Sequence, residues 1–196
     1  STQLAVIGTK LDGSFGNTPV AALGIVFTLI GFAFKVSAVP FHNWAPDTYE
    51  GAPTPVTAFL SVASKAGGFV ALLSVVIFGF FPQQDMWQPV LWLLAALSMI
   101  LGNLVALRQT NIVRMLAYSS IAQGGFILVP LAVAGDGGAA RVSFEAVLIY
   151  LFIYAAMNLG AFAVVIAVAR RTGSAEIDTY AGLGQTGPGL AITLTI

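Results

Sequence analysis

The sequence predicts an all-α fold, a polytopic bundle of transmembrane helices, from its composition and its long apolar runs. Hydrophobic residues make up 58% of the 196 residues and charged residues only 8%, far from the balance of a soluble domain. A hydrocarbon core of roughly 30 Å requires about 20 apolar residues in a helix that rises about 1.5 Å per residue. Several runs of this length follow one another with a helical period. We expect a single transmembrane domain over residues 1–196, with five full spans and the start of a sixth.

Prolines, glycines and charged residues mark the ends of the predicted spans. A loop with a short apolar stretch at residues 4–7 leads to the first span. Pro19 marks the start of this span, and we expect the span to be broken near Pro40. Arg108 marks the end of the third span. The predicted spans cover residues 20–41, 55–81, 87–107, 112–134 and 144–169, and a polar loop at 172–187 precedes a truncated span that begins at Pro188. Because the chain starts at Ser1 and stops inside an apolar run, we expect it to be an internal fragment of a larger subunit.

The distribution of positive charge predicts the orientation, since the side that retains more Lys and Arg is normally cytoplasmic. One side carries Arg108, Arg114, Arg170 and Arg171, together with the loop at residues 42–53. The other side carries Lys10, Asp85, Asp136 and Arg141. We therefore expect the His42 loop inside and the amino-terminal end outside.

Composition also excludes several classes of function for these residues. There is no cysteine, so disulfides, thiolate metal sites and iron–sulfur ligation are excluded within the chain. The formal net charge is zero and there is no basic stripe to neutralise phosphates, which argues against a nucleic-acid partner. Any redox centre must lie elsewhere.

Lys35 and Lys65 lie inside consecutive apolar runs. A lysine at the centre of a membrane helix costs about 2.5–3.5 kcal/mol on insertion scales unless it faces a wet or paired interior. Two such residues suggest a path for protons or ions. Pro40 lacks an N–H, so we expect the Val36 carbonyl beside Lys35 to lose its helical partner and to hold water. The alternative for each lysine is a side chain that snorkels to the interface, which is harder for Lys65 because it lies near the midplane.

Other polar residues have a functional and a structural interpretation. His42 is either a proton shuttle at the inner mouth of a half-channel or an anchor of a helix end beside Pro40. Asp47 and Glu50 either cap a short helix or collect protons. A polar cluster on the fourth span either bonds to neighbouring helices or lines water; it consists of Tyr118, Ser119, Ser120 and Gln123. We interpret Glu145 as a solvated carboxylate at a helix start and Asn158 as a packing contact.

Two ordered stretches carry a family resemblance. The first reads FKVSAVPFHNWAPDTYEGAPTPVT at residues 34–57 and is followed by Ser64 and Lys65; the second reads GNLVALRQTNIVRMLAYSSI at residues 102–121. Together they resemble the antiporter-like membrane subunits of respiratory complex I, and within that family the branch called subunit N in bacterial NADH–quinone oxidoreductase and subunit 2 in mitochondria. The resemblance covers nearly the whole chain from Leu23 onward. It implies a piece running from the seventh helix to the start of the twelfth helix of a fourteen-helix subunit.

The resemblance also implies a function. The chain would belong to a proton-translocating subunit in which Lys35 loads protons on a broken helix and Lys65 connects. Together with His42, which the residue itself suggests as a shuttle at the inner mouth, these are the candidate relay residues. NAD, FMN, iron–sulfur clusters and quinone would be bound by partner subunits, with none in this chain, and the partners would be other membrane subunits and the lipid of a bacterial inner membrane. The family's fifth-helix glutamate and twelfth-helix lysine would fall outside the chain. Many antiporter-like subunits carry histidine where this chain has Gln123, which cannot take up a proton.

Three alternatives remain open at this point. A subunit of a Mrp-type cation–proton antiporter shares the lysine and proline arrangement. A subunit of a group 4 membrane-bound hydrogenase is a closer variant of the first interpretation. A membrane scaffold without transport activity is the third.

Overall fold

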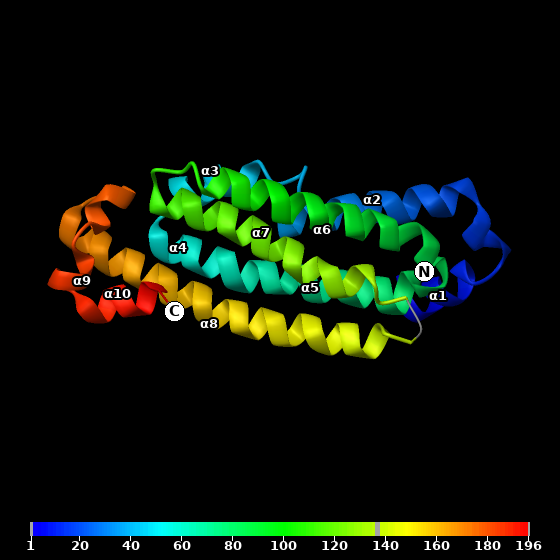
Figure 1. The fold of residues 1–196 in the computed structure, drawn as a ribbon. Coiled ribbons are helices and arrows are strands. Elements are labelled where there is room, and N and C mark those ends of the chain that lie inside the picture. Colours follow the sequence, from blue (N-terminus) through cyan, green and yellow to red (C-terminus); the bar gives the residue numbers. More distant parts are fainter. Residues whose placement is uncertain (1, 136–137, 196) are drawn as a thin grey trace.

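In a computed structural model of the chain, residues 2–135 and 138–195 are described, and they form a bundle of elongated helices (Figure 1). The α-helices are α1 (Leu4–Leu11), α2 (Pro19–Val36), α3 (Trp44–Gly51), α4 (Thr54–Phe59), α5 (Lys65–Ser74), α6 (Gln84–Ala106), α7 (Ile112–Ala132), α8 (Ala140–Thr172), α9 (Leu183–Thr186) and α10 (Pro188–Thr195). Two π-helical segments, η2 (Leu60–Ser64) and η3 (Val75–Phe80), flank α5. Short 3₁₀ turns are η1 (Ser14–Asn17), η4 (Phe81–Gln83) and η5 (Ile177–Tyr180). The prediction of an all-α fold is confirmed.

Four helical stretches within the described residues are long and apolar enough to cross a membrane. They are Pro19–Val36, Thr54–Ala106, Ile112–Ala132 and Ala140–Thr172. The second stretch has 53 residues and folds back at η4, so that α6 returns along the bundle (Figure 1). The Trp87 Nε1–H donates to the Phe80 carbonyl across this turn, at 2.8 Å.

Two segments predicted as loops are helical. Residues 4–11 form α1, because the apolar side chains around Gly8 pack its backbone against η3; a Cβ at Gly8 would lie 2.8 Å from the Phe78 carbonyl oxygen. Residues 44–51 form α3. They lie within the predicted loop at 42–53, where one interpretation of Asp47 and Glu50 is that they cap a short helix, and α3 is such a helix. Pro46 is tolerated because it lies in the first turn of α3, where a helix does not need its N–H.

The first predicted span ends earlier than Pro40. Its start at Pro19 is confirmed, and the Thr18 Oγ1 accepts the Ala21 N–H at 3.3 Å as an N-cap. The helix stops at Val36 because Ser37 adopts a left-handed conformation with φ of 61°, and its N–H closes the last turn onto the Ala33 and Phe34 carbonyls. Pro40 therefore lies in an irregular segment four residues beyond the last helical residue, near the break that the sequence predicted.

The bundle has two distinct ends. At one end, the Ile112 N–H donates to Ala175 and the Ile177 N–H donates to Thr110, both at 2.8 Å, so the α6–α7 loop lies beside the segment after α8. At the other end, the Gln83 amide donates to the Leu11 carbonyl at 2.9 Å, which holds the start of α6 beside α1. Asp136, which the charge distribution assigned to this second end, lies outside the described residues.

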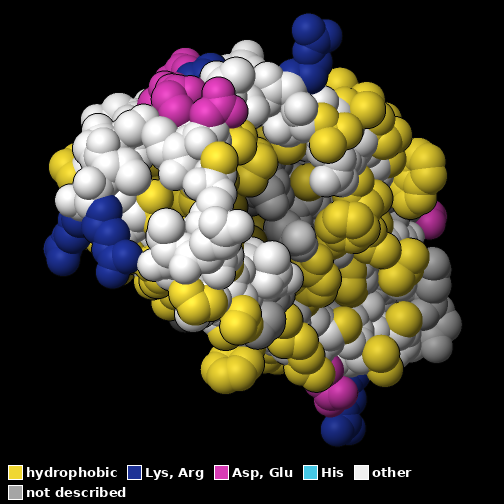
Figure 2. All heavy atoms as spheres, turned by 60° about the vertical axis from the view of Figure 1, so that its left-hand side comes forward, with side chains coloured by type: hydrophobic (Ala, Val, Ile, Leu, Met, Phe, Trp, Pro, Cys, Tyr) yellow, Lys and Arg dark blue, Asp and Glu magenta, His cyan; other side chains and the backbone are white. Residues whose placement is uncertain are grey.

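The flanks of the bundle are apolar. Large side chains such as Phe27, Trp92 and Phe152 are exposed by 67%, 63% and 78%. Figure 2 shows hydrophobic side chains over much of the visible surface, with charged side chains in a few separate clusters. This is the pattern of a surface that contacts lipid or other membrane helices.

Candidate functional site

Lys65 is buried in the interior of the bundle. Its side chain comes from the first residue of α5, directly after the π-helical η2, and only 4% of the residue is exposed. The ammonium donates to the Ser120 carbonyl oxygen at 2.7 Å and to the Ser120 Oγ at 2.6 Å. In the described part of the chain, the ion pairs involve Arg114 and Arg141 only, so the partners of Lys65 are neutral oxygens.

Lys35 reaches the same helix from the other side. It lies in the last turn of α2, and its Nζ donates to the Ser64 Oγ at 2.9 Å. Its stem packs over Gly68, where a Cβ would lie 3.2 Å from the Lys35 Cγ. The structure thus brings Lys35 to the residue that precedes Lys65. Lys35 itself is exposed, so its surroundings are open on one side.

A glycine of α7 makes room beside Lys65. A Cβ on Gly124 would lie 3.8 Å from the Lys65 Nζ and 3.6 Å from the Val36 carbonyl oxygen. Val36 is the last residue of α2, so its carbonyl has no helical N–H four residues on, where Pro40 stands. The free carbonyl at the end of α2 and the ammonium of Lys65 therefore border the same space over Gly124.

The first residues of the break between α2 and α3 are buried, and side chains of neighbouring helices bond to its backbone, whereas Pro40 and Asn43 further along the break are exposed. Ser37, Ala38 and Val39 are each no more than 3% exposed. The Val39 N–H donates to the Ser98 Oγ of α6 at 2.9 Å, and the Trp44 Nε1–H donates to the Phe34 carbonyl at 2.9 Å. Irregular backbone at membrane depth is tolerated where protein covers it, which is the case here. Ser98 had no distinguishing signal in the sequence.

His42 lies in this break. The edge of its ring faces Tyr118 of α7, with centroids 6.4 Å apart, and its Nδ1 is buried without a hydrogen-bond partner in the described structure. Tyr118 is the seventh residue of α7, about 9 Å from the start of that helix at 1.5 Å per residue. The backbone of Tyr118, which His42 contacts through its ring, thus lies about one helical turn further along α7 than that of Arg114. No contact described for His42 reaches either lysine.

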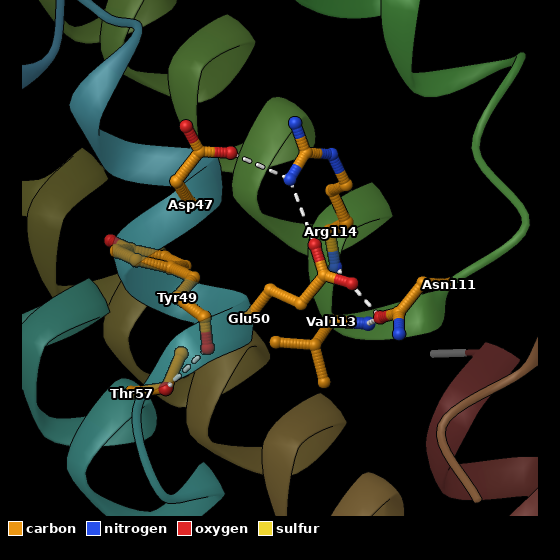
Figure 3. A network of polar contacts seen from close by, with 7 residues as sticks. All are labelled: Asp47, Tyr49, Glu50, Thr57, Asn111, Val113 and Arg114. Atoms are coloured by element: carbon orange, nitrogen blue, oxygen red, sulfur yellow. Dashed lines mark hydrogen bonds and ion pairs between the residues drawn. The ribbon is translucent and has the colours of Figure 1, made fainter.

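Asp47 and Glu50 form ion pairs that the sequence analysis missed (Figure 3). The Arg114 Nη1 lies 2.7 Å from the Asp47 Oδ1 and 2.8 Å from the Glu50 Oε2. The Asn111 Oδ1 caps α7 by accepting the Val113 and Arg114 N–H groups, at 2.9 Å and 3.2 Å, and this fixes the backbone that carries Arg114. The three charged side chains join α3 to the start of α7.

A polar cluster between α7, α8 and η2 surrounds the Ser120 contact. The Tyr154 hydroxyl donates to the Ser120 Oγ at 2.9 Å and lies 3.3 Å from the Ser61 carbonyl oxygen. The Asn158 amide donates to the Ser61 Oγ at 2.6 Å, and one turn away the Tyr150 hydroxyl donates to Gln123. The bonds of Ser120 and Gln123 to α8 confirm the expectation of cross-helix bonding. Tyr154 and Ser61 were missed, although Tyr150, Tyr154 and Asn158 recur every four residues, which places them on one helix face.

The described residues contain no group of three or more His, Cys, Asp or Glu side chains that could hold a metal ion. The arrangement is instead suited to proton exchange. It places the buried amine of Lys65 against the hydroxyls of Ser120 and Tyr154, and the exposed amine of Lys35 against the hydroxyl of Ser64.

Comparison with known proteins gives a consistent family. A sequence profile described as NADH:quinone oxidoreductase/Mrp antiporter, TM, matches residues 2–196. NAD(P)H-quinone oxidoreductase subunit 2 of Synechococcus sp. (strain CC9902) is 50% identical over 196 residues, which are 100% of this chain and 36% of the relative. NADH-quinone oxidoreductase subunit N of Desulforamulus reducens is 51% identical over 181 residues, 92% of this chain and 37% of the relative. The chain thus spans little more than a third of the length of these relatives.

Solved structures share the fold. A chain of respiratory complex I from Thermus thermophilus with bound aureothin is 33% identical, with a TM-score of 0.66 over 96% of this chain and 42% of that chain. A chain of the membrane-bound sulfane sulfur reductase, an archaeal respiratory membrane complex, is 27% identical, with a TM-score of 0.81 over 96% of this chain and 38% of that chain. A chain of the Mrp complex from Dietzia sp. DQ12-45-1b is 22% identical, with a TM-score of 0.85 over 100% of this chain and 35% of that chain, and this last likeness concerns the fold alone.

Proposed function

Because the chain belongs to the family of NADH:quinone oxidoreductase and Mrp antiporter membrane subunits, we propose that it is part of a proton-translocating membrane-arm subunit of NADH–quinone oxidoreductase. The relatives at about half identity carry the names of subunit 2 and subunit N of such enzymes. The chain is a piece of a multi-pass membrane protein. In the whole subunit it would supply five membrane crossings and the start of a sixth within a single transmembrane domain.

The proposed setting is a bacterial inner membrane. Partner subunits of the same complex would bind NAD, FMN, iron–sulfur clusters and quinone, and would carry out electron transfer. This chain would contribute to the proton path and hold no redox centre. Its direct partners would be lipid and other membrane subunits, which fits the exposed apolar flanks.

Lys35, Lys65 and His42 are proposed as proton-relay residues, and the burial of Lys65 is the observation that carries the proposal. Its amine is held by neutral oxygens in the bundle interior, so its charge is not fixed there by a carboxylate of the described residues. A buried amine without a fixed counter-charge can gain and lose a proton as its surroundings change. Lys35 would exchange protons with it near Ser64, and His42 would act in the break between α2 and α3.

Replacement of Lys65 tests the relay. In the Lys65→Ala complex we expect normal assembly, with proton translocation and coupled NADH–quinone activity reduced at least several-fold. Lys65→Arg should restore function only in part, because guanidinium does not release its proton near neutral pH. Lys10→Ala is the matched control, since Lys10 is exposed at the far end of the bundle. Normal pumping by an assembled Lys65→Ala complex would remove Lys65 from the path.

A Mrp-type antiporter subunit is the second candidate, and the similar fold of a Mrp complex chain favours considering it. A hydrogenase-type respiratory complex is a further variant of the same family. Purification of the native complex separates the candidates: flavin-containing and iron–sulfur subunits should accompany this chain in a NADH–quinone oxidoreductase. Their absence from an intact, active complex would favour the antiporter.

Labelling of introduced cysteines tests the proposed orientation. The chain has no cysteine of its own, so single cysteines at Thr48, Asp85 and Ser174 can be placed in a cysteine-depleted host subunit. With an impermeant thiol reagent on intact cells, the Asp85 position should react, whereas the Thr48 and Ser174 positions should not. The opposite pattern would invert the orientation and with it the direction of proton entry.

A further inference from the structure

The Ser120 hydroxyl is the point where several helices meet around Lys65. Its Oγ lies 2.6 Å from the Lys65 Nζ and 2.9 Å from the Tyr154 hydroxyl, and Tyr49 of α3 also approaches the Ser120 side chain. Ser120 and Tyr154 are each only 2% exposed. A serine hydroxyl accepts up to two hydrogen bonds and donates one. The single O–H bond of Ser120 can therefore point either toward Lys65 or toward Tyr154.

The same atoms permit two complete hydrogen-bond arrangements. In the first arrangement Lys65 is an ammonium and donates to the Ser120 Oγ, and the Ser120 hydroxyl donates to the Tyr154 oxygen. The Tyr154 hydroxyl then donates to the Ser61 carbonyl oxygen, which lies 3.3 Å from it. When Lys65 is a neutral amine, Tyr154 donates to Ser120, Ser120 donates to the lone pair of the amine, and the amine N–H donates to the Ser120 carbonyl at 2.7 Å. Between them the two hydroxyl hydrogens rotate, and the one covalent change is the N–H bond that Lys65 gains or loses with its proton.

We propose that Tyr154 is a positioning residue which, through Ser120, reverses the direction of this hydrogen-bond chain as Lys65 gains and loses its proton. In the charged arrangement every dipole of the chain points its negative end toward the ammonium, and in the neutral arrangement the lone pair of the amine is satisfied. Neither state leaves one of these buried hydroxyls without a partner, which would be costly. The inference rests on the proposed role of Lys65 as a proton carrier and deepens it.

Titratable groups near the site other than Tyr49 and Tyr154 have separate partners. Lys35 of α2 bonds to Ser64, and Tyr150 of α8 bonds to Gln123. Tyr49 of α3 approaches Ser120 but is not hydrogen-bonded to Lys65. From α7, the described contacts of Lys65 are with Ser120 alone. Tyr154 therefore shares the approach to Ser120 with Tyr49, and Tyr154 is the one whose hydrogen bond to the Ser120 Oγ has a described length, 2.9 Å.

The variant Tyr154→Phe removes the acceptor that Ser120 needs in the charged arrangement. Lys65 should then hold its proton less strongly. The pH profile of proton translocation should have one limb that is absent from the Lys65→Ala complex. In Tyr154→Phe this limb should move to lower pH by roughly half to one unit. The measurement uses the whole complex in sealed membrane vesicles over a range of pH values. Tyr150→Phe, on the same face of α8 but bonded to Gln123, is the matched control and should leave the profile in place.

A double-mutant cycle separates this role from mere packing. In a Ser120→Ala background, Tyr154→Phe should produce no further shift, because the chain is already cut at Ser120. Additive shifts, or an unchanged profile in an assembled Tyr154→Phe complex, would overturn the proposal. If Tyr154→Phe does not assemble, Ser120→Ala alone must still shift the profile toward lower pH. Normal pumping by Lys65→Ala would instead refute the proposed function itself, so the two failures are distinguishable.

Discussion

Replacing Arg114 by glutamine should loosen α3 from the start of α7. Arg114, Asp47 and Glu50 have side chains exposed by 32%, 73% and 42%, so each ion pair is partly solvated and contributes about 0.2–1 kcal/mol. Both carboxylates bond to the same nitrogen, Nη1, so neither pair gains the strength of a bidentate fork. Loss of both pairs should cost about 1 kcal/mol, which is about a fivefold change in the equilibrium for local opening of α3.

Amide hydrogen exchange in the purified complex measures this opening directly. In Arg114→Gln, the amides of α3 (Trp44–Gly51) should exchange about fivefold faster than in the wild type, while those of α6 should not change. Arg141→Gln is the control, because it removes an exposed pair within α8 that does not touch α3. At about 1 M salt, where the Debye length is about 3 Å, the difference between wild type and Arg114→Gln should shrink. Unchanged exchange in α3, or equal acceleration in the control, would refute the reasoning.

Two further predictions concern the surroundings of the break and of Lys35. Gly68→Ala would place a Cβ 3.2 Å from both the Lys35 and Val36 side chains, so we expect an assembled complex with several-fold weaker proton translocation. Gly67→Ala is the control and should pump normally, because nothing lies within 4 Å of a Cβ at that position. Ser98→Ala removes the acceptor of the buried Val39 N–H and should destabilise the fold by about 1–3 kcal/mol, which appears as a lower melting temperature of the complex. Equal pumping by the two glycine variants, or an unchanged melting temperature for Ser98→Ala, would contradict the corresponding contact.

The sequence predicts the apolar helices well because the requirement is local. A bilayer demands a long apolar run, and proline at a helix start and arginine after a helix end are visible in the run itself, as at Pro19 and Arg108. It also predicts a break near Pro40. It does not predict that the helix ends at Val36, because that end depends on the left-handed Ser37 and on Ser98, which is 59 residues away from its partner Val39.

The candidate site was predictable as a set of residues but not as a set of contacts. Lys35 and Lys65 stand out because charge inside an apolar run is rare. The partners of Lys65 do not stand out, since serine and tyrosine are common in membrane helices and Ser120 lies 55 residues from Lys65. Asp47 and Glu50 were interpreted through their own short helix, whereas their partner Arg114 lies more than 60 residues further on. Pairings at such separations are set by how the helices pack.

Glycines explain how a tightly packed bundle accommodates two lysines. Gly125 faces α6, where a Cβ would lie 2.8 Å from the Ala95 carbonyl oxygen, so it permits close approach of α6 and α7. Its neighbour Gly124, about 100° further round the helix, faces α5 and the end of α2 and leaves space beside the Lys65 ammonium and the Val36 carbonyl. Each glycine costs about 1 kcal/mol in a helix relative to alanine. At Gly124 the gain is room beside the Lys65 amine, and the proposed rearrangement of its hydrogen bonds would require that room more than it would require tight packing.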